Sequence, residues 1–184
     1  MSIGTILIYL SLAISVVSFI FLVMSATGRK SALILGERLF YLSGIFVLFA
    51  VILLFAAFLT HSFNFNYVYS YSSKDLPLIY LITAFWAGQE GTFLLWVFLL
   101  FIFGFFVIRS NEENKDIHLA VITITQVFIF LMLVVHGPFE YIWDVRPMSF
   151  RPGVIPADGS GLNPLLQNPW MVIHPPVLFV GYAS

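Results

Sequence analysis

Long apolar runs, separated by short polar segments, dominate the hydrophobic pattern of this chain. A helix needs about 20 mostly apolar residues to cross a bilayer. Four runs reach that length and a fifth begins later and continues to the last residue; they cover residues 3–26, 39–60, 90–108, 118–136 and 172–184. The pattern predicts an all-α, polytopic transmembrane helical bundle, a single membrane domain with about four full spans and the start of a fifth.

Composition supports a membrane protein and excludes several other classes. The 184 residues are 60% hydrophobic and 9% charged, whereas soluble domains are about 25% charged. The net charge of −1 offers no basic surface for nucleic acid, and the absence of cysteine excludes disulfides and thiolate metal sites within this chain. Residues 3–26 exceed the apolar core of a signal peptide and have no basic residue before them, so we interpret them as a retained span.

The distribution of Lys and Arg predicts the orientation. Two short loops, residues 27–38 and 109–117, carry five of the eight basic residues. The long loops, residues 61–76 and 137–170, carry the other three. Because basic residues favour the cytoplasmic side, we expect the short loops in the cytoplasm and the long loops on the exoplasmic side, which is periplasmic for a protein of the cytoplasmic (inner) membrane. The uninterrupted apolar end at residues 172–184 predicts either an N-terminal fragment of a longer membrane protein or a short surface helix.

The third apolar region, residues 77–108, is interrupted by the sequence Ala-Gly-Gln-Glu-Gly at residues 87–91. Glu90 is acidic inside a hydrophobic run, where a charge is costly without a partner or water. Trp86, Gln89, Glu90 and Phe93 have the spacing of one helical face. Either this face borders a site near the outer end of the span, or Glu90 only stabilises the start of a helix.

The long outer loop at residues 137–170 is rich in proline and aromatic residues, which favours an ordered loop over a disordered one. Asn163 precedes a proline and predicts the cap of a short helix that continues to Gln167. By itself this motif indicates only a structured loop.

The sequence His174-Pro175-Pro176 follows this loop. A residue before proline favours extended backbone, so we expect His174 at the mouth of the fifth helix on the outer side. Its imidazole could ligate a metal or haem iron, or it could be a capping or interfacial residue. The remaining histidines, at positions 61, 118 and 136, are predicted to be interfacial.

These segments together resemble one family. Tyr67-Val68, Leu76-Pro77, Trp-Ala-Gly-Gln-Glu-Gly at residues 86–91, Leu-Leu-Trp at 94–96, Leu-Asn-Pro-Leu-Leu-Gln-Asn-Pro at 162–169 and His-Pro-Pro at 174–176 occur in this order. The set resembles the N-terminal part of CcmF, the haem lyase subunit of cytochrome c-type biogenesis, and of its paralogue NrfE. The chain departs from the family pattern at Thr92, where Ser is usual, and at Ser160, where Arg or Gln is common.

The resemblance implies a haem-handling protein of cytochrome c maturation. Such a protein receives haem b from the chaperone CcmE at the outer membrane face, for covalent attachment to the CxxCH motif of apocytochrome c, which a CcmH-type subunit presents. The axial ligand to the haem iron would be His174. The wider haem-binding set would be Pro175, Pro176, Trp86, Gln89, Glu90, Asn163 and Gln167, and no residue is assigned a catalytic role.

Whether this chain itself carries lyase activity is left open. The tryptophan-rich outer motif and the further histidines of the family do not occur in these 184 residues, so the chain is expected to be a fragment or one part of a split protein. The alternative functions are a polytopic transporter, or a membrane subunit of a respiratory complex, that uses Glu90, and a purely structural membrane subunit.

Overall fold

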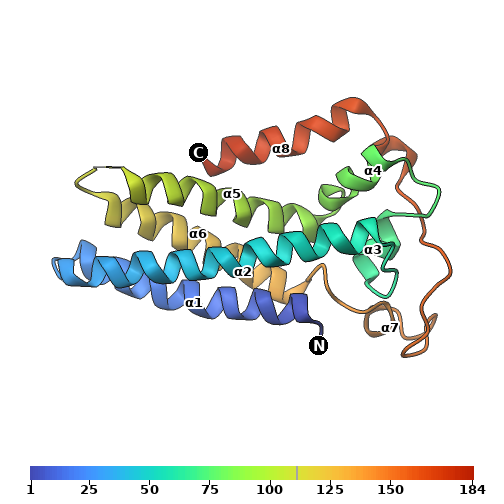
Figure 1. Cartoon of the computed structure of the whole chain (residues 1–184), viewed down its shortest axis with the longest axis horizontal. Helices are drawn as coiled ribbons and strands as arrows, with labels where there is room; N and C mark the ends of the chain where they lie inside the picture. The colour runs from blue at the N-terminus through green and yellow to red at the C-terminus, as the bar shows by residue number, and fades with distance from the viewer. Residues whose placement is uncertain (111) are drawn as a thin grey trace.

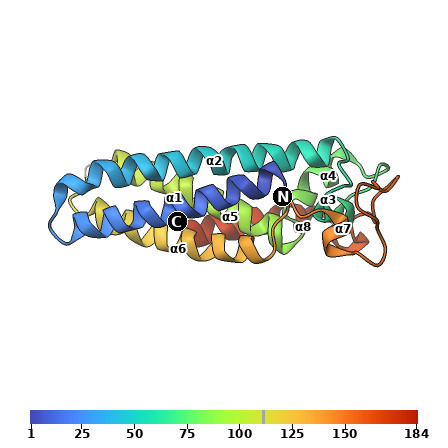
Figure 2. The same cartoon turned by 90° about the horizontal axis from the view of Figure 1, so that it is seen from below.

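Four long helices lie side by side in the computed structural model, which describes residues 1–110 and 112–184 (Figure 1). They are α1 (Ile3–Ala26), α2 (Leu33–Leu59), α5 (Gln89–Arg109) and α6 (Lys115–Val135). Helix α1 packs against α2 and α6, and α5 closes the bundle against the same two helices (Figure 2). All four are long and apolar enough to cross a membrane, and the described residues contain no strand. The predicted fold class, a polytopic helical membrane protein, is confirmed.

Small polar residues allow the helices of the bundle to approach closely. Buried serines line the face of α1 that contacts α2, where Ser15 and Ser43 share a hydroxyl hydrogen bond of 2.8 Å and Ser18 donates to the carbonyl oxygen of Gly36 at 2.8 Å. Small residues at helix contacts are typical of membrane bundles, in which packing and interhelical hydrogen bonds drive association. The α1–α2 pair is therefore specified by serine and glycine as much as by apolar bulk.

Ion pairs join the helices at the end of the bundle with the short connections. Lys30 Nζ lies 2.6 Å from the buried Asp116 carboxylate, which also accepts a hydrogen bond from Ser25, and Lys115 Nζ lies 2.8 Å from Glu37. The α1–α2 connection also holds the 3-10 turn η1 (Lys30–Ala32). These contacts hold the first turns of α2 and α6 in place.

The helix starts predicted at residues 39 and 118 are therefore wrong. Helix α2 begins at Leu33 and α6 at Lys115, so Arg38 belongs to a helix and not to a loop. The polar residues that indicated loops form helix turns because partners on neighbouring helices pair with their charges. Asn111, in the predicted loop between residues 109 and 117, lies outside the described residues.

Short helices gather at the opposite end of the bundle, where Met1 also lies (Figure 1). They are α3 (Asn66–Tyr71), α4 (Leu78–Thr83), the 3-10 turn η2 (Ala84–Trp86), α7 (Ile142–Val145) and the 3-10 turn η3 (Pro164–Leu166). The long loop is tied to α3, because Ser160 N–H donates to Tyr69 O at 2.8 Å and Gly161 N–H donates to Ser72 O at 3.0 Å. The loop between α6 and α8 is thus structured, as its composition predicts.

Helix α8 (Pro169–Ala183) starts earlier than the sequence predicts. Asn168 caps it by accepting a hydrogen bond from Trp170 N–H at 3.0 Å, and Pro169 occupies the first turn, where its missing N–H costs nothing. The helix then runs back along α5, with the rings of Trp96 and Phe179 5.5 Å apart. His174 therefore lies inside α8 and not at its mouth, because the cap at Asn168, six residues earlier, outweighs the local preference imposed by Pro175.

Candidate functional site

The turn between η2 and α5 is built around Tyr67 of α3. Its side chain is buried, and its hydroxyl donates to Phe85 O at 2.9 Å and accepts from Gly88 N–H at 3.0 Å. Burial raises the pKa of the Tyr67 phenol well above its usual value, an effect to which the negative charge of Glu90 adds. The phenol therefore stays protonated and can keep donating to the turn.

Two small features let the chain make this turn. A Cβ at Gly91 would overlap the carbonyl oxygen of Phe85, so only glycine fits there. The hydroxyl of Thr92 donates to Gly88 O at 2.6 Å and ties the turn to the first turn of α5.

Trp86 connects this turn to α8. Its indole Nε1–H donates to the carbonyl oxygen of Val172 at 3.2 Å. In a regular helix that carbonyl would accept from the N–H four residues later, but position 176 is proline and has no N–H. The indole supplies the hydrogen bond that the helix cannot make, so Trp86 and the His-Pro-Pro segment form one structural unit.

The loop that precedes α8 completes this junction. A cavity of about 70 Å³ is lined by Thr83, Trp86, Ala87, Leu162, Leu166 and Pro175. Gln167 donates through Nε2 to Leu162 O at 2.9 Å and accepts from the Tyr80 hydroxyl at its backbone carbonyl at 3.1 Å. Asn163 caps η3 by accepting from Leu165 N–H at 3.0 Å, as its position before proline predicts. Asn163 and Gln167 thus shape the loop against α4 and η2.

His174 does not line this cavity; it lies on an exposed apolar face of α8. Together with Trp170, Ile173 and Val177, at helical spacings of three, four and seven residues, it lines an open depression of about 400 Å³. Trp170 is 79% exposed and Val177 is 64% exposed. The His174 side chain is also exposed. The depression therefore combines apolar walls with one nitrogen ligand.

Glu90 lies in a different part of the end of the bundle where the short helices gather. It lies half-buried in the first turn of α5, at a helix start that favours a carboxylate. Burial raises the pKa of Tyr71, and the charge of Glu90 raises it further. Neither Glu90 nor the exposed Gln89 lines the depression around His174.

The predicted common face of Trp86, Gln89, Glu90 and Phe93 is wrong. Trp86 belongs to η2, and Gly88 separates it from α5 with an extended backbone (φ −119°, ψ 173°). The helical spacing assumed a continuous helix, whereas the glycine and the Tyr67 hydroxyl stop one helix and start another. The predicted site residues therefore form three groups: the junction of Trp86, Asn163, Gln167, Pro175 and Pro176; the exposed His174; and the α5 start with Gln89 and Glu90.

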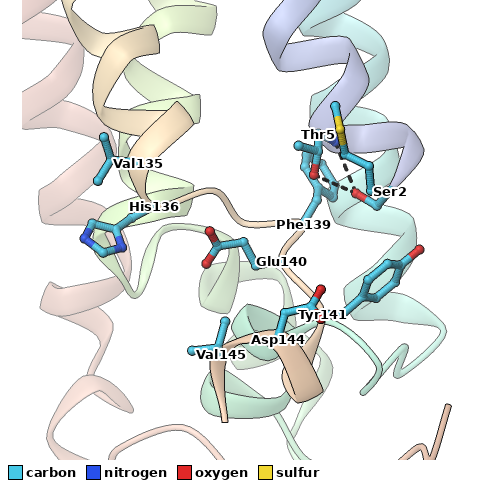
Figure 3. Close-up of a pocket in the computed structure, with 10 residues that line it drawn as sticks. Ser2, Thr5, Val135, His136, Phe139, Glu140, Tyr141, Asp144 and Val145 are labelled. Carbon is cyan, nitrogen blue, oxygen red and sulfur yellow. Dashed lines mark hydrogen bonds between the residues drawn. The ribbon is translucent and has the colours of Figure 1, made fainter. Parts of the chain in front are cut away.

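Another cavity at this end of the bundle, of about 470 Å³, opens between the start of α1 and the end of α6 (Figure 3). His136, Glu140 and Asp144 line it together with the N-terminal residues. Burial raises the pKa of the Glu140 carboxyl, and the nearby His136 opposes that rise. Within residues 1–110 and 112–184, no group of three His, Cys, Asp or Glu side chains could hold a metal ion. The sequence alone does not reveal this cavity, because its lining residues come from distant segments.

The 86–91 turn, the 162–169 loop and the His-Pro-Pro helix all lie in the part of the chain that matches a known family. The family model for cytochrome c assembly proteins matches residues 86–184. The chain belongs to the cytochrome c assembly protein family. The match includes both partners of the Trp86–Val172 hydrogen bond and the exposed His174.

Individual relatives show which members of the family this chain resembles. The cytochrome c-type biogenesis protein CcmF of Escherichia coli (strain K12) is 32% identical over 185 residues, a match that covers 99% of this chain and 28% of the relative. NrfE of Haemophilus influenzae is 31% identical over 137 residues, covering 72% of this chain and 20% of the relative. A solved structure described as the cytochrome c haem lyase CcmF superposes with a TM-score of 0.77 at 25% identity, covering 98% of this chain and 27% of that chain.

These comparisons confirm the predicted CcmF/NrfE resemblance and the multi-pass membrane architecture. The chain spans between a fifth and just over a quarter of the length of the curated relatives that it matches. They do not bear on the roles of individual residues, which rest on the geometry described above.

Proposed function

We propose that this chain forms the part of a CcmF-type haem lyase that receives haem at the outer membrane face for covalent attachment to apocytochrome c. The observation that carries the proposal is His174, an exposed imidazole on an apolar helix face within the segment that matches the family. Neutral imidazole is a common axial ligand of haem iron. The haem is a substrate in this proposal, because it leaves on the cytochrome.

The chemistry of the depression fits such a substrate. A porphyrin is a large apolar disc with a metal at its centre, and it needs apolar walls with one ligand aimed at the metal. Trp170, Ile173 and Val177 supply apolar surface within one turn on either side of His174. The exposed indole of Trp170 can also cover a flat aromatic surface.

The rest of the junction holds this ligand in place. Pro175 packs into the cavity beside Trp86, and the indole of Trp86 holds the first turns of α8 through Val172 O. Asn163 and Gln167 fix the loop on the other side of that cavity. These residues bind no substrate in this account; they keep the helix that carries His174 from rotating or fraying.

The partners and the location follow from the family resemblance. Haem b would arrive from the chaperone CcmE, and a CcmH-type subunit would present the apocytochrome. In the ligation step each cysteine S–H adds across a haem vinyl group, so that a C–S bond forms and the proton ends on the neighbouring carbon. We place the protein in the cytoplasmic membrane with both long loops on the periplasmic side, because five of the eight Lys and Arg lie at the opposite end.

The proposal is tested by haem content. His174→Ala, in the protein purified from cells that mature cytochrome c, should lose at least nine-tenths of its co-purified haem and of its cytochrome yield at equal protein level. His118→Ala is the matched control, because His118 is an exposed histidine at the other end of the bundle, where it pairs with Glu112. Equal haem and cytochrome yield in the two variants would remove His174 from the site.

The alternative of a Glu90-dependent transporter gains no support from the fold. Glu90 lies in the first turn of α5 at the outer end, whereas ion sites of secondary transporters lie near the middle of the bilayer.

A further inference from the structure

An apolar groove runs along the exposed side of α2 and α5, and His174 does not line it. It has a volume of about 470 Å³ and is lined by Phe40, Tyr41, Gly44, Ile45, Leu48, Phe98, Phe101, Ile102, Phe105 and Phe106. These residues belong to the first half of α2 and the last part of α5, so the groove lies in the half of the bundle nearest the short, basic connections. Gly44 leaves room for it, because a Cβ there would come within 3.0 Å of the Phe101 ring.

Two arginines stand at the basic end of this groove. Arg38 lies one helical turn before Tyr41 on α2, and Arg109 follows Phe105 by one turn on α5. The guanidinium of Arg109 lies 4.3 Å from the ring centroid of Phe105, and the rings of Phe105 and Tyr41 are 6.0 Å apart. Both arginines are exposed, so they flank one mouth from two helices.

The charges of these arginines are available, unlike those of their neighbours. Lys30 pairs with Asp116 and Lys115 pairs with Glu37, so the two lysines at this end are neutralised. In the described part of the chain, neither Arg38 nor Arg109 has an acidic partner. Arginine presents its donors in a planar fork that fits phosphate, and basic pockets between membrane helices bind anionic lipid headgroups.

We propose that this groove is a binding site for one anionic phospholipid of the leaflet at the basic end of the bundle. An acyl chain lies in the aromatic groove between α2 and α5, and the headgroup phosphate is bound by Arg38 and Arg109. Charge complementarity selects this occupant over a zwitterionic lipid, because neither arginine forms an ion pair within the described residues. The site does not depend on haem, and it provides a headgroup-specific contact to the α2–α5 side of the bundle.

Native mass spectrometry of the purified protein in detergent tests the site. The probes are phosphatidylglycerol and phosphatidylcholine with identical acyl chains, and inorganic phosphate alone. We expect phosphatidylglycerol to bind about 30-fold more tightly than phosphatidylcholine, and phosphate alone not to bind measurably. The double variant R38Q/R109Q should remove the preference, whereas Arg29→Gln, at an exposed arginine of the same end away from the groove, should keep it.

A second pair of variants tests the groove itself. Ile45→Trp should block lipid binding by filling the groove, and Ile52→Trp should not, because Ile52 is an exposed α2 residue outside it. Equal binding of the two lipids, or an R38Q/R109Q double variant that behaves as Arg29→Gln does, would overturn the proposal. The proposal would also fail if the wild-type protein bound no lipid and a cross-linking residue introduced at position 45 reacted with another protein segment, since a helix would then occupy the groove.

Discussion

The Trp86–Val172 hydrogen bond makes a sharp prediction for the variant Trp86→Phe. The change removes the indole donor to Val172 O, which the N–H at position 176 cannot replace because that residue is proline. A buried polar group left without a partner costs about 1–3 kcal/mol, more than the net value of about 1 kcal/mol for an average hydrogen bond. We expect the docked state of α8 to lose that amount while the four long helices stay intact.

Hydrogen exchange of the backbone amides at the C-terminal half of α8 measures this loss. Local opening that becomes easier by about 1–3 kcal/mol should raise exchange roughly 5- to 150-fold. Trp96→Phe is the matched control, because Trp96 also packs against α8 but its indole N–H has no hydrogen-bond partner among the described residues. Removing an unsatisfied donor should change exchange far less.

A double-mutant cycle isolates the cause. Pro176→Ala gives α8 an N–H that can bond to Val172 O within the helix, so Trp86→Phe should cost little in that background. If Trp86→Phe raises exchange no more than Trp96→Phe does, or costs the same with and without Pro176, then the indole does not compensate for the proline and the coupling argument fails.

Three further outcomes follow from other parts of the structure. Gly91→Ala should lower the unfolding temperature sharply, because the added Cβ would overlap a backbone carbonyl oxygen. Gly181→Ala is the control: it has open space around it and should be neutral or slightly stabilising. A Gly91→Ala variant with an unchanged unfolding temperature would contradict the turn geometry. The pKa of the Asp158 carboxyl is lowered chiefly by the backbone N–H groups of Lys74 and Gly159. The charged carboxylate therefore stabilises the loop between α6 and α8 above about pH 4, the usual Asp pKa, and this stabilisation is lost as the pH falls through the lower pKa of the folded state. Pepsin cleavage of this loop, normalised to the denatured chain, should therefore increase as the pH falls below 4 in the wild type but not in Asp158→Asn, and equal pH dependence would exclude the effect. Topology tags in the α1–α2 and α5–α6 connections should report cytoplasm and a tag in the loop after α7 should report periplasm, and the reverse result would overturn the orientation.

The long helices could be predicted from sequence because the length and hydropathy of a span are local properties. The starts of α2 and α6 could not, because they depend on pairs such as Lys30–Asp116, whose members are 86 residues apart. Charges next to an apolar run indicate a loop until a partner on another helix is known. Both helices therefore begin earlier than the sequence predicts, and each includes residues of the preceding short connection.

At the candidate site, contacts between distant segments limit prediction from sequence even more. Its motifs could be recognised, and Asn163 could be identified as a cap, because an Asn-Pro pair acts within a few residues. Tyr67 could not be identified as the anchor of the turn, because the signal for it lies about 20 residues away in the turn that it holds. His174 was misplaced for a similar reason: the local effect of Pro175 favoured a helix mouth, but the cap at Asn168 and the hydrogen bond from Trp86 allow a helix to continue through two prolines.

The central claim is that the His174 imidazole binds haem iron, and chemical rescue tests it most directly. The purified His174→Gly variant, loaded with haem and titrated with free imidazole, would be followed by optical and electron paramagnetic resonance spectra. The account predicts that the variant loses the axial histidine signature and regains it, with haem retention, when imidazole occupies the vacated position. An unchanged spectrum in the variant, or a lost signature that imidazole never restores although the protein stays folded, would contradict it.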